Sequence, residues 1–164
     1  MGDPPKAKTC AGLVVMGLYI RLCRMTLNPQ DVAIVVAEDD PDDRLLAEEA
    51  LEEAGITNRV VWVKDGVELL DWLGENEQGQ VIVLLDINMP RMDGHEALRL
   101  IREREKGSVV VVMLTTSAQE EDVVRSYDLG VNSYMRKPLD PDDFVALAYK
   151  FGAYWLDGSE LPVR

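Results

Sequence analysis

The sequence predicts a doubly wound α/β domain, in which a five-stranded parallel sheet carries helices on both faces. Two observations lead to this fold class. From residue 32 onward, short apolar runs rich in Val and Ile alternate with stretches of helical periodicity, which is typical of fully buried strands joined by crossover helices. The length of 164 residues and the 47% hydrophobic composition suit one domain with its own core.

The first predicted strand covers residues 32–37 and ends at an acidic segment. Asp40 then provides an N-cap and Pro41 a first helical position, so a helix is expected to start there. Asp42 and Asp43 follow in its first turn, where negative charge is favourable. These aspartates are therefore interpreted as capping or solvated residues.

The remaining elements continue the same alternation. Gly74 and Gly79 are expected to break the second helix. We expect right-handed crossovers and the flavodoxin-like strand order 2-1-3-4-5. Further strands are expected at residues 60–63, 81–85, 109–114 and 132–135, and further helices at 67–73, 95–105, 118–129 and 141–156.

Residues 1–27 form an extension that precedes the domain. Its apolar run at residues 11–23 contains Arg21 and is shorter than the ~20 residues that span a bilayer. Three interpretations stay open: a flexible segment upstream of a start at Met25, a peripheral membrane contact, or an arm for self-association. The chain is thus divided into an extension at 1–27, a domain at 28–158 and a tail at 159–164.

The charge and cysteine content exclude several function classes. Seventeen Lys and Arg against 30 Asp and Glu give a net charge of -13, which repels a nucleic-acid backbone. Cys10 and Cys23 have no metal-ligand spacing and no partners elsewhere in the chain. We expect no nucleic-acid partner, no membrane span, no zinc site and a reducing, cytoplasmic location.

Acidic side chains directly follow two of the predicted strands. Glu38 and Asp39 follow the first strand and Asp86 follows the third, and these strands are neighbours in the expected order. Clustered carboxylates favour a hard divalent cation, and Mg²⁺ takes oxygen ligands. The sequence therefore predicts a Mg²⁺ site with Asp39 and Asp86 as direct ligands, Glu38 acting through water, and the backbone carbonyl of Asn88 within reach.

Two further side chains follow strands at the same edge. Lys137 comes after the fifth strand and offers a point charge for phosphate oxygens, and Thr115, at the end of the fourth strand, offers a hydroxyl. Together with a metal ion, these groups suit a phosphoryl group that is attacked in line by a carboxylate. No organic cofactor is predicted.

Four segments, in order along the chain, resemble the receiver domain of two-component response regulators, whose fold is that of the chemotaxis regulators. The resemblance covers residues 32–156 and lies in VVAEDDPDD (35–43), VLLDINMPRMDG (83–94), VMLTTS (112–117) and NSYMRKP (132–138). It implies that Asp86 is the phosphoacceptor, Glu38 and Asp39 the acidic pair, Thr115 the switch hydroxyl and Tyr134 the switch aromatic residue. It also implies a cis peptide bond before Pro138.

The resemblance further implies a signalling protein rather than an enzyme. A sensor histidine kinase would donate the phosphoryl group, and the surface of residues 118–129, 132–135 and 141–156 would change and serve as a partner or homodimer face. Only eight residues follow Leu156, so output is expected through contacts with an unknown downstream protein. Parts of the sequence are similar to the small stand-alone receivers that accompany phytochrome-type histidine kinases.

Two other functions stay open. The first is a receiver-like binding module that is not regulated by phosphorylation. The second is a Mg²⁺-dependent phosphatase that forms an aspartyl phosphate, but Asn88 stands where such enzymes carry an acid–base Asp. His95 is expected to be a surface residue. Ser117 and Asn88 are placed by the resemblance where they influence the access of water to the phosphoryl group.

Overall fold

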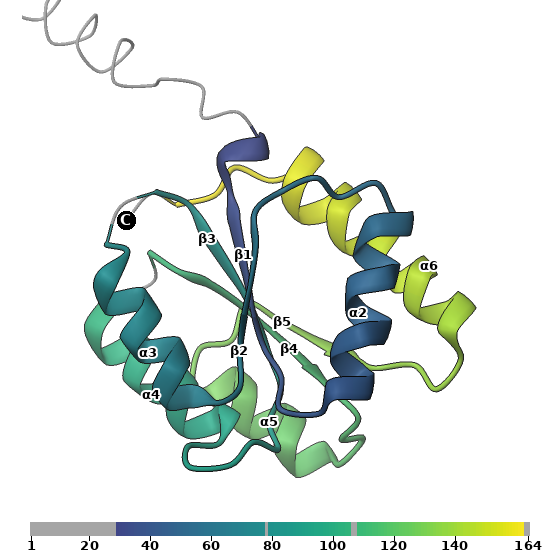
Figure 1. Ribbon diagram of the computed structural model, residues 1–164. Coiled ribbons are helices and arrows are strands. Elements are labelled where there is room, and N and C mark those ends of the chain that lie inside the picture. The colour runs from purple at the N-terminus through teal and green to yellow at the C-terminus, as the bar shows by residue number, and fades with distance from the viewer. Residues whose placement is uncertain (1–28, 78, 106–107, 163–164) are drawn as a thin grey trace, which may run out of the picture.

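The computed structural model describes residues 29–77, 79–105 and 108–162. Its strands and helices alternate along the chain (Figure 1). The strands are β1 (Ala33–Ala37), β2 (Val60–Val63), β3 (Val81–Leu85), β4 (Val110–Thr115) and β5 (Ser133–Arg136). The α-helices are α2 (Pro41–Glu53), α3 (Gly66–Glu75), α4 (Gly94–Glu105), α5 (Glu120–Asp128) and α6 (Pro141–Phe151), with a 3₁₀ turn η1 (Pro29–Asp31) before them and a π-helix η2 (Gly152–Asp157) after them.

The five strands form one parallel sheet in the order β2-β1-β3-β4-β5, which confirms the predicted fold class and strand order. The register pairs Ala37 with Leu85 between β1 and β3, and Leu85 with Met113 between β3 and β4. The carboxyl ends of β1, β3 and β4 therefore meet at one edge of the sheet, where α/β folds bind their ligands.

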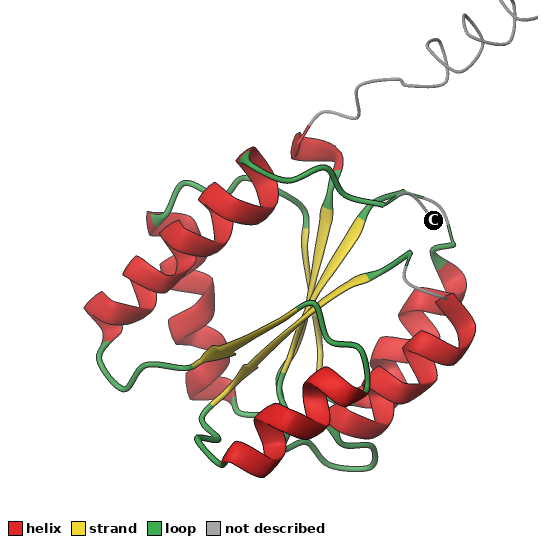
Figure 2. Cartoon of the chain, turned by 180° about the vertical axis from the view of Figure 1, so that it is seen from behind, coloured by secondary structure: helices red, strands yellow, loops and turns green. Residues whose placement is uncertain are grey.

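Helices cover both faces of the sheet, as Figures 1 and 2 show from opposite sides. Alternating side chains of each strand enter opposite cores, so Val83 packs in one core and Ile82 in the other. The first core lies under α3 and α4, and the second under α2 and α6. All five residues of β3 are buried, because this central strand is covered on both faces.

Helix α2 begins as the sequence predicts. The Asp40 carboxylate accepts hydrogen bonds from the backbone N–H groups of Asp42 (2.8 Å) and Asp43 (3.3 Å), and Pro41 occupies the first turn. The capping interpretation of Asp40 is confirmed. This cap fixes the path of the chain between the end of β1 and the first turn of α2, which matters for the site below.

Three expected element boundaries differ from the structure by more than one residue. Gly74 lies inside α3, which continues to Glu75 and ends at Asn76, where the side-chain amide donates to the Trp72 carbonyl at 2.8 Å. The last helix is α-helical only to Phe151 and continues as the π-helix η2. Helix α5 begins at Glu120 rather than near residue 118.

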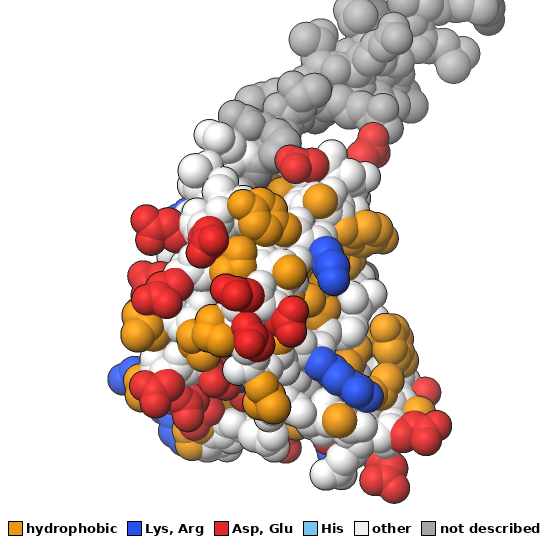
Figure 3. Space-filling model, turned by 90° about the vertical axis from the view of Figure 1, so that its right-hand side faces the viewer, with side chains coloured by type: hydrophobic (Ala, Val, Ile, Leu, Met, Phe, Trp, Pro, Cys, Tyr) orange, Lys and Arg blue, Asp and Glu red, His pale blue; other side chains and the backbone are white. Residues whose placement is uncertain are grey.

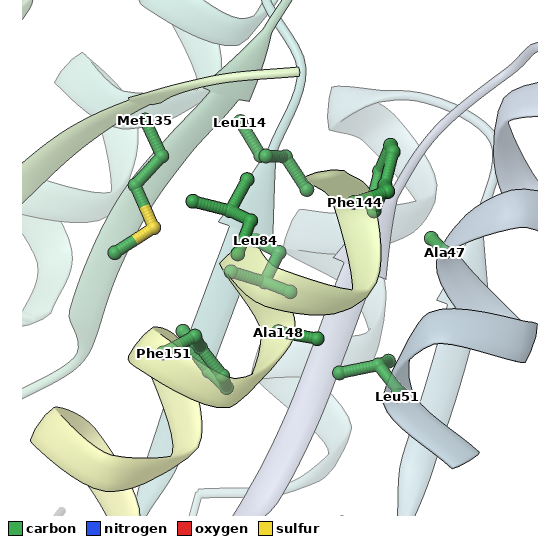
Figure 4. Close-up of a pocket in the computed structure, with 9 residues that line it drawn as sticks. Ala47, Leu51, Leu84, Leu114, Met135, Phe144, Ala148 and Phe151 are labelled. Carbon is green, nitrogen blue, oxygen red and sulfur yellow. The ribbon is translucent and has the colours of Figure 1, made fainter. Parts of the chain in front are cut away.

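The aromatic residues of the last helix pack on the sheet. Phe144 and Phe151 are buried, and Trp155 in η2 is 9% exposed. A small cavity of about 20 Å³ remains between α2, α6 and the strand ends, and Figure 4 shows the apolar side chains around it. Its lining is almost wholly apolar, as expected where α2 and α6 pack on the sheet.

The molecular surface over α2 and α6 is rich in acidic side chains mixed with hydrophobic ones (Figure 3). This distribution fits the net charge of -13.

None of the helices in the described residues has the length and hydropathy of a membrane span. The predicted extension at 1–27 lies outside the described residues. Near the other end, the Leu161 carbonyl accepts a hydrogen bond from the Gln80 side chain at 2.8 Å.

Candidate functional site

The acidic residues that follow β1 and β3 meet at the carboxyl edge of the sheet. A backbone hydrogen bond from the Asp86 N–H to the Ala37 carbonyl (3.1 Å) continues the strand pairing to the point where the acids begin. Glu38, Asp39 and Asp86 each offer one carboxylate oxygen, and these three oxygens lie within 4.8 Å of one another. Glu38 and Asp86 are each 7% exposed, whereas Asp39 is exposed.

This donor set fits a hard divalent cation. Three carboxylate oxygens at this spacing match the preference of Mg²⁺ for oxygen ligands with water in the remaining positions. The exposure of Asp39 leaves one side of the cluster open to solvent and ligands. Asn88, whose carbonyl is predicted to take part, lies exposed two residues after Asp86.

Lys137 enters the same cluster from the end of β5. Its ammonium contacts the carboxylates of Glu38, of Asp43 at 2.8 Å and of Asp86 at 3.3 Å. Burial disfavours the charged form, but the bonds to Asp43 and Glu38 outweigh this effect, and the pKa of Lys137 lies above its ordinary value. Burial raises the pKa of Glu38 despite the lowering effect of Lys137, and the charge of Asp86 adds to the rise.

Asp43 is the partner of Lys137 that the sequence interpretation missed. Its carboxylate turns to Lys137, although the residue was interpreted as part of a cap or as solvated. The motif gives no sign of this contact, because it depends on where the first turn of α2 lies relative to β5.

The loop from Asp86 to Gly94 is held by its own backbone and by α3. The Ile87 N–H donates to Asp86 Oδ1 at 2.7 Å, and the Gly94 N–H donates to the Ile87 carbonyl at 2.9 Å. Gly94 allows this close approach, since a Cβ there would lie 2.1 Å from the Asp86 carbonyl oxygen. The loop thus fixes one carboxylate oxygen of Asp86 and leaves Oδ2 facing Lys137.

A second attachment of this loop was not anticipated from the sequence. Arg91 adopts a positive φ of 60° and donates from Nε to Asp65 Oδ2 at 2.5 Å. Asp65 is 1% exposed and also caps α3 through bonds to the N–H groups of Val67 and Glu68. Desolvation would raise the pKa of Asp65, but these backbone bonds and the Arg91 guanidinium lower it below its ordinary value.

The predicted switch residues Thr115 and Tyr134 both contact the backbone of Ser117. Thr115 is fully buried at the end of β4, and its hydroxyl oxygen accepts a hydrogen bond from the Ser117 N–H at 3.3 Å. The Tyr134 hydroxyl donates to the Ser117 carbonyl at 3.1 Å, and burial raises the pKa of this phenol. Ser117 in turn donates to Asp122 at 2.5 Å, so one loop connects β4, β5 and α5.

Two expectations near the site are wrong. The peptide bond before Pro138 is not cis, because no cis bond occurs among the described residues. The Lys137 side chain still points into the cluster. The backbone N–H of Lys137 donates to the Thr115 carbonyl at 2.9 Å and so extends the pairing of β4 with β5. His95 is 2% exposed rather than on the surface, and its Nε2 lies 3.0 Å from the Ser126 hydroxyl on α5.

Residues 34–149 match the response regulator receiver domain family. The chain belongs to this family. Its five-stranded fold and the positions of its strand-end residues agree with that assignment.

Two named relatives cover most of the domain. The probable methanogenesis regulatory protein FilR2 of Methanothrix harundinacea is 37% identical over 134 residues, 79% of this chain and 86% of FilR2. The response regulator Rcp1 of Synechocystis is 33% identical over 141 residues, 82% of this chain and 95% of Rcp1.

Solved structures agree with the sequence comparison. The Mn²⁺-bound form of Rcp1 has a TM-score of 0.70 and 32% identity, with 79% of this chain and 98% of that chain covered. The phosphorylated cyanobacterial phytochrome response regulator RcpA has a TM-score of 0.71 and 34% identity, with 79% and 97% covered. The receiver is thus homologous to a protein that is named as a phytochrome response regulator.

Proposed function

We propose that this receiver is a single-domain response regulator that accepts a phosphoryl group on Asp86 from a phosphohistidine of a sensor histidine kinase. The observation that carries the proposal is the meeting of Asp86 Oδ2 with the Lys137 ammonium at 3.3 Å inside a cluster of three carboxylates. In the transfer, Asp86 attacks phosphorus while the bond between phosphorus and the histidine nitrogen breaks. The electron pair returns to the imidazole, which takes its proton from solvent.

Asp39 and Asp86 would bind Mg²⁺ directly, with Glu38 acting through water and the Asn88 carbonyl completing the protein ligands. When bound, the ion supplies positive charge that neutralises the carboxylates and the incoming phosphoryl oxygens. The Mn²⁺-bound form of the relative Rcp1 supports a divalent ion in this family. Lys137 adds a second positive charge, and burial of its side chain to 3% exposure keeps that charge little screened by solvent.

The readout would pass through Thr115 and Tyr134. Phosphorylation adds negative charge beside Lys137 and draws the ammonium and the Thr115 hydroxyl toward Asp86. Thr115 is bonded to the Ser117 segment, and Tyr134 bonds to the same segment. A shift of that segment alters the surface of α5, β5 and α6, which would serve as the face for a downstream protein or for a second copy of the chain.

The relatives favour a phytochrome-type kinase as the donor. Rcp1 and RcpA are covered over 95% and 97% of their lengths, and RcpA is named as a phytochrome response regulator that has been observed phosphorylated. We propose the same class of partner here, together with a cytoplasmic location and the domain limits 28–158.

The test is the mass of the intact protein after incubation with acetyl phosphate, with and without Mg²⁺, for wild type and Asp86→Asn. We expect a Mg²⁺-dependent gain of one phosphoryl group that Asp86→Asn abolishes. Asp128→Asn, on the exposed surface of α5, serves as a matched control and should behave as wild type. Absence of labelling in the wild type would favour a receiver that binds its partners without phosphorylation.

A further inference from the structure

Lys137 has no free donor in the unphosphorylated protein. An ammonium group has three N–H donors, and three carboxylates contact it, those of Glu38, Asp43 and Asp86. Lys137 must therefore release or share one of these bonds before it can donate to a phosphoryl oxygen on Asp86.

The three carboxylates differ in burial and in their other roles. The side chains of Glu38 and Asp86 are 5% and 9% exposed. Their carboxylates belong, with that of Asp39, to the cluster that suits a divalent cation. Asp43 is 32% exposed, lies on the first turn of α2 and is not part of that group. A cation bound by the cluster would compete with Lys137 for Glu38 and Asp86 but not for Asp43.

We propose that Asp43 is a positioning residue that holds the Lys137 ammonium and competes with the phosphoryl group for it. This inference rests on the proposed function and adds a residue that controls its rate. With the cation bound, Asp43 is the carboxylate that keeps Lys137 fixed near the site. When the phosphoryl group arrives, the same carboxylate opposes the move of Lys137 toward Asp86 and adds negative charge close to the incoming phosphoryl oxygens.

Removal of the Asp43 charge should therefore speed phosphorylation and slow hydrolysis of the aspartyl phosphate. The free energy of a hydrogen bond to a charged group is reduced here because Asp43 is partly exposed. The remaining free energy corresponds to a change of about threefold to tenfold in each rate. The experiment measures labelling by acetyl phosphate at saturating Mg²⁺, followed by loss of the label after the donor is removed, for Asp43→Asn and Asp43→Glu.

Asp42→Asn is the matched control, because Asp42 lies on the same helical turn, carries the same charge and is exposed. We expect Asp43→Asn to label faster than both wild type and Asp42→Asn, and Asp43→Glu to return toward the wild-type rates. Equal rates for Asp43→Asn and Asp42→Asn would overturn the inference and leave the proposed function intact. Thermal unfolding of each variant checks that α2 remains folded.

A second measurement reads the position of Lys137 without any phosphorylation. The ¹⁵Nζ resonance of Lys137, assigned with Lys137→Arg, should shift in Asp43→Asn and stay in place in Asp42→Asn. If the wild type takes no phosphoryl group, that result refutes the proposed function but not the inference about Asp43. The Lys137 resonance in Asp43→Asn then decides whether the inference holds. An unchanged resonance in Asp43→Asn would show that Asp43 does not hold Lys137.

Discussion

The Lys137 ammonium and the Glu38 carboxylate form a buried ion pair across 99 residues of sequence, with side chains only 3% and 5% exposed. This pair joins the end of β5 to the end of β1. Glu38 is the first of the site residues along the chain, and Lys137 is the last. Asp86 lies between them at the end of β3. The groups proposed for phosphoryl transfer are thus also part of what holds the edge of the sheet together.

Replacement of Lys137 by Met should destabilise the protein most at neutral pH. The substitution leaves Glu38 and Asp86 buried without their cation, which costs about 3 kcal/mol. Burial already raises the pKa of Glu38, and loss of Lys137 raises it further. An acid with a raised pKa in the folded state favours folding at low pH and loses that contribution as pH rises, so the deficit should shrink toward about pH 5.

Chemical denaturation of wild type and Lys137→Met across about pH 5 to 8 checks this dependence. The wild-type contribution of Lys137 itself is constant in this window, because its pKa is raised above an ordinary value of 10.5. Lys150→Met, on the exposed face of α6, serves as control and should leave stability nearly unchanged. A deficit of equal size at every pH would contradict the account of Glu38.

Replacement of Gly94 by Ala should distort the loop that carries Asp86. A Cβ at residue 94 would lie 2.1 Å from the Asp86 carbonyl oxygen and 2.9 Å from its carbonyl carbon. These are backbone atoms and cannot rotate away, so we expect a loss of about 3 kcal/mol in the free energy of unfolding together with slower labelling by acetyl phosphate.

Gly74→Ala is the control for the general effect of the substitution. A Cβ at residue 74 meets nothing within 4 Å, and the residue lies inside α3. Since Ala is the better helix former, this variant should gain about 0.5–1 kcal/mol and label at the wild-type rate. Equal stability of the two alanine variants in urea denaturation would show that the close approach at Gly94 has no energetic weight.

The sequence predicted those parts of the site that follow directly from strand ends. Glu38, Asp39 and Asp86 end two apolar runs, and the parallel strand order is enough to bring them together. Asp43 could not be placed in this way. Its contact with Lys137 depends on where the first turn of α2 lies against the end of β5, and no local pattern encodes that position.

The attachment of Arg91 to Asp65 was hidden for a similar reason. It requires a positive φ at a non-glycine residue and a partner 26 positions earlier in the chain. The surface interpretation of His95 failed because its hydrogen-bond partner, Ser126, lies 31 positions later on another helix. Sequence periodicity predicts which residues share an element, but side-chain pairs between elements depend on how the elements pack.

The hydrogen bond between His95 and Ser126 should contribute measurably to stability, because it fixes the first turn of α4 to α5. The Ser126 hydroxyl donates to the Asp122 carbonyl at 2.7 Å, and in the tautomer that carries the proton on Nε2 the Ser126 oxygen accepts from His95. His95→Phe and Ser126→Ala each remove one partner of this buried bond. Each should lower the free energy of unfolding by about 1–2 kcal/mol.

A double-mutant cycle isolates the pair. The variant with both substitutions should lose less than the sum of the two single losses, with a coupling of about 1 kcal/mol, because the second substitution no longer leaves a buried group without its partner. Urea denaturation of the four proteins gives the four free energies. Strict additivity would mean that the two side chains do not interact in solution.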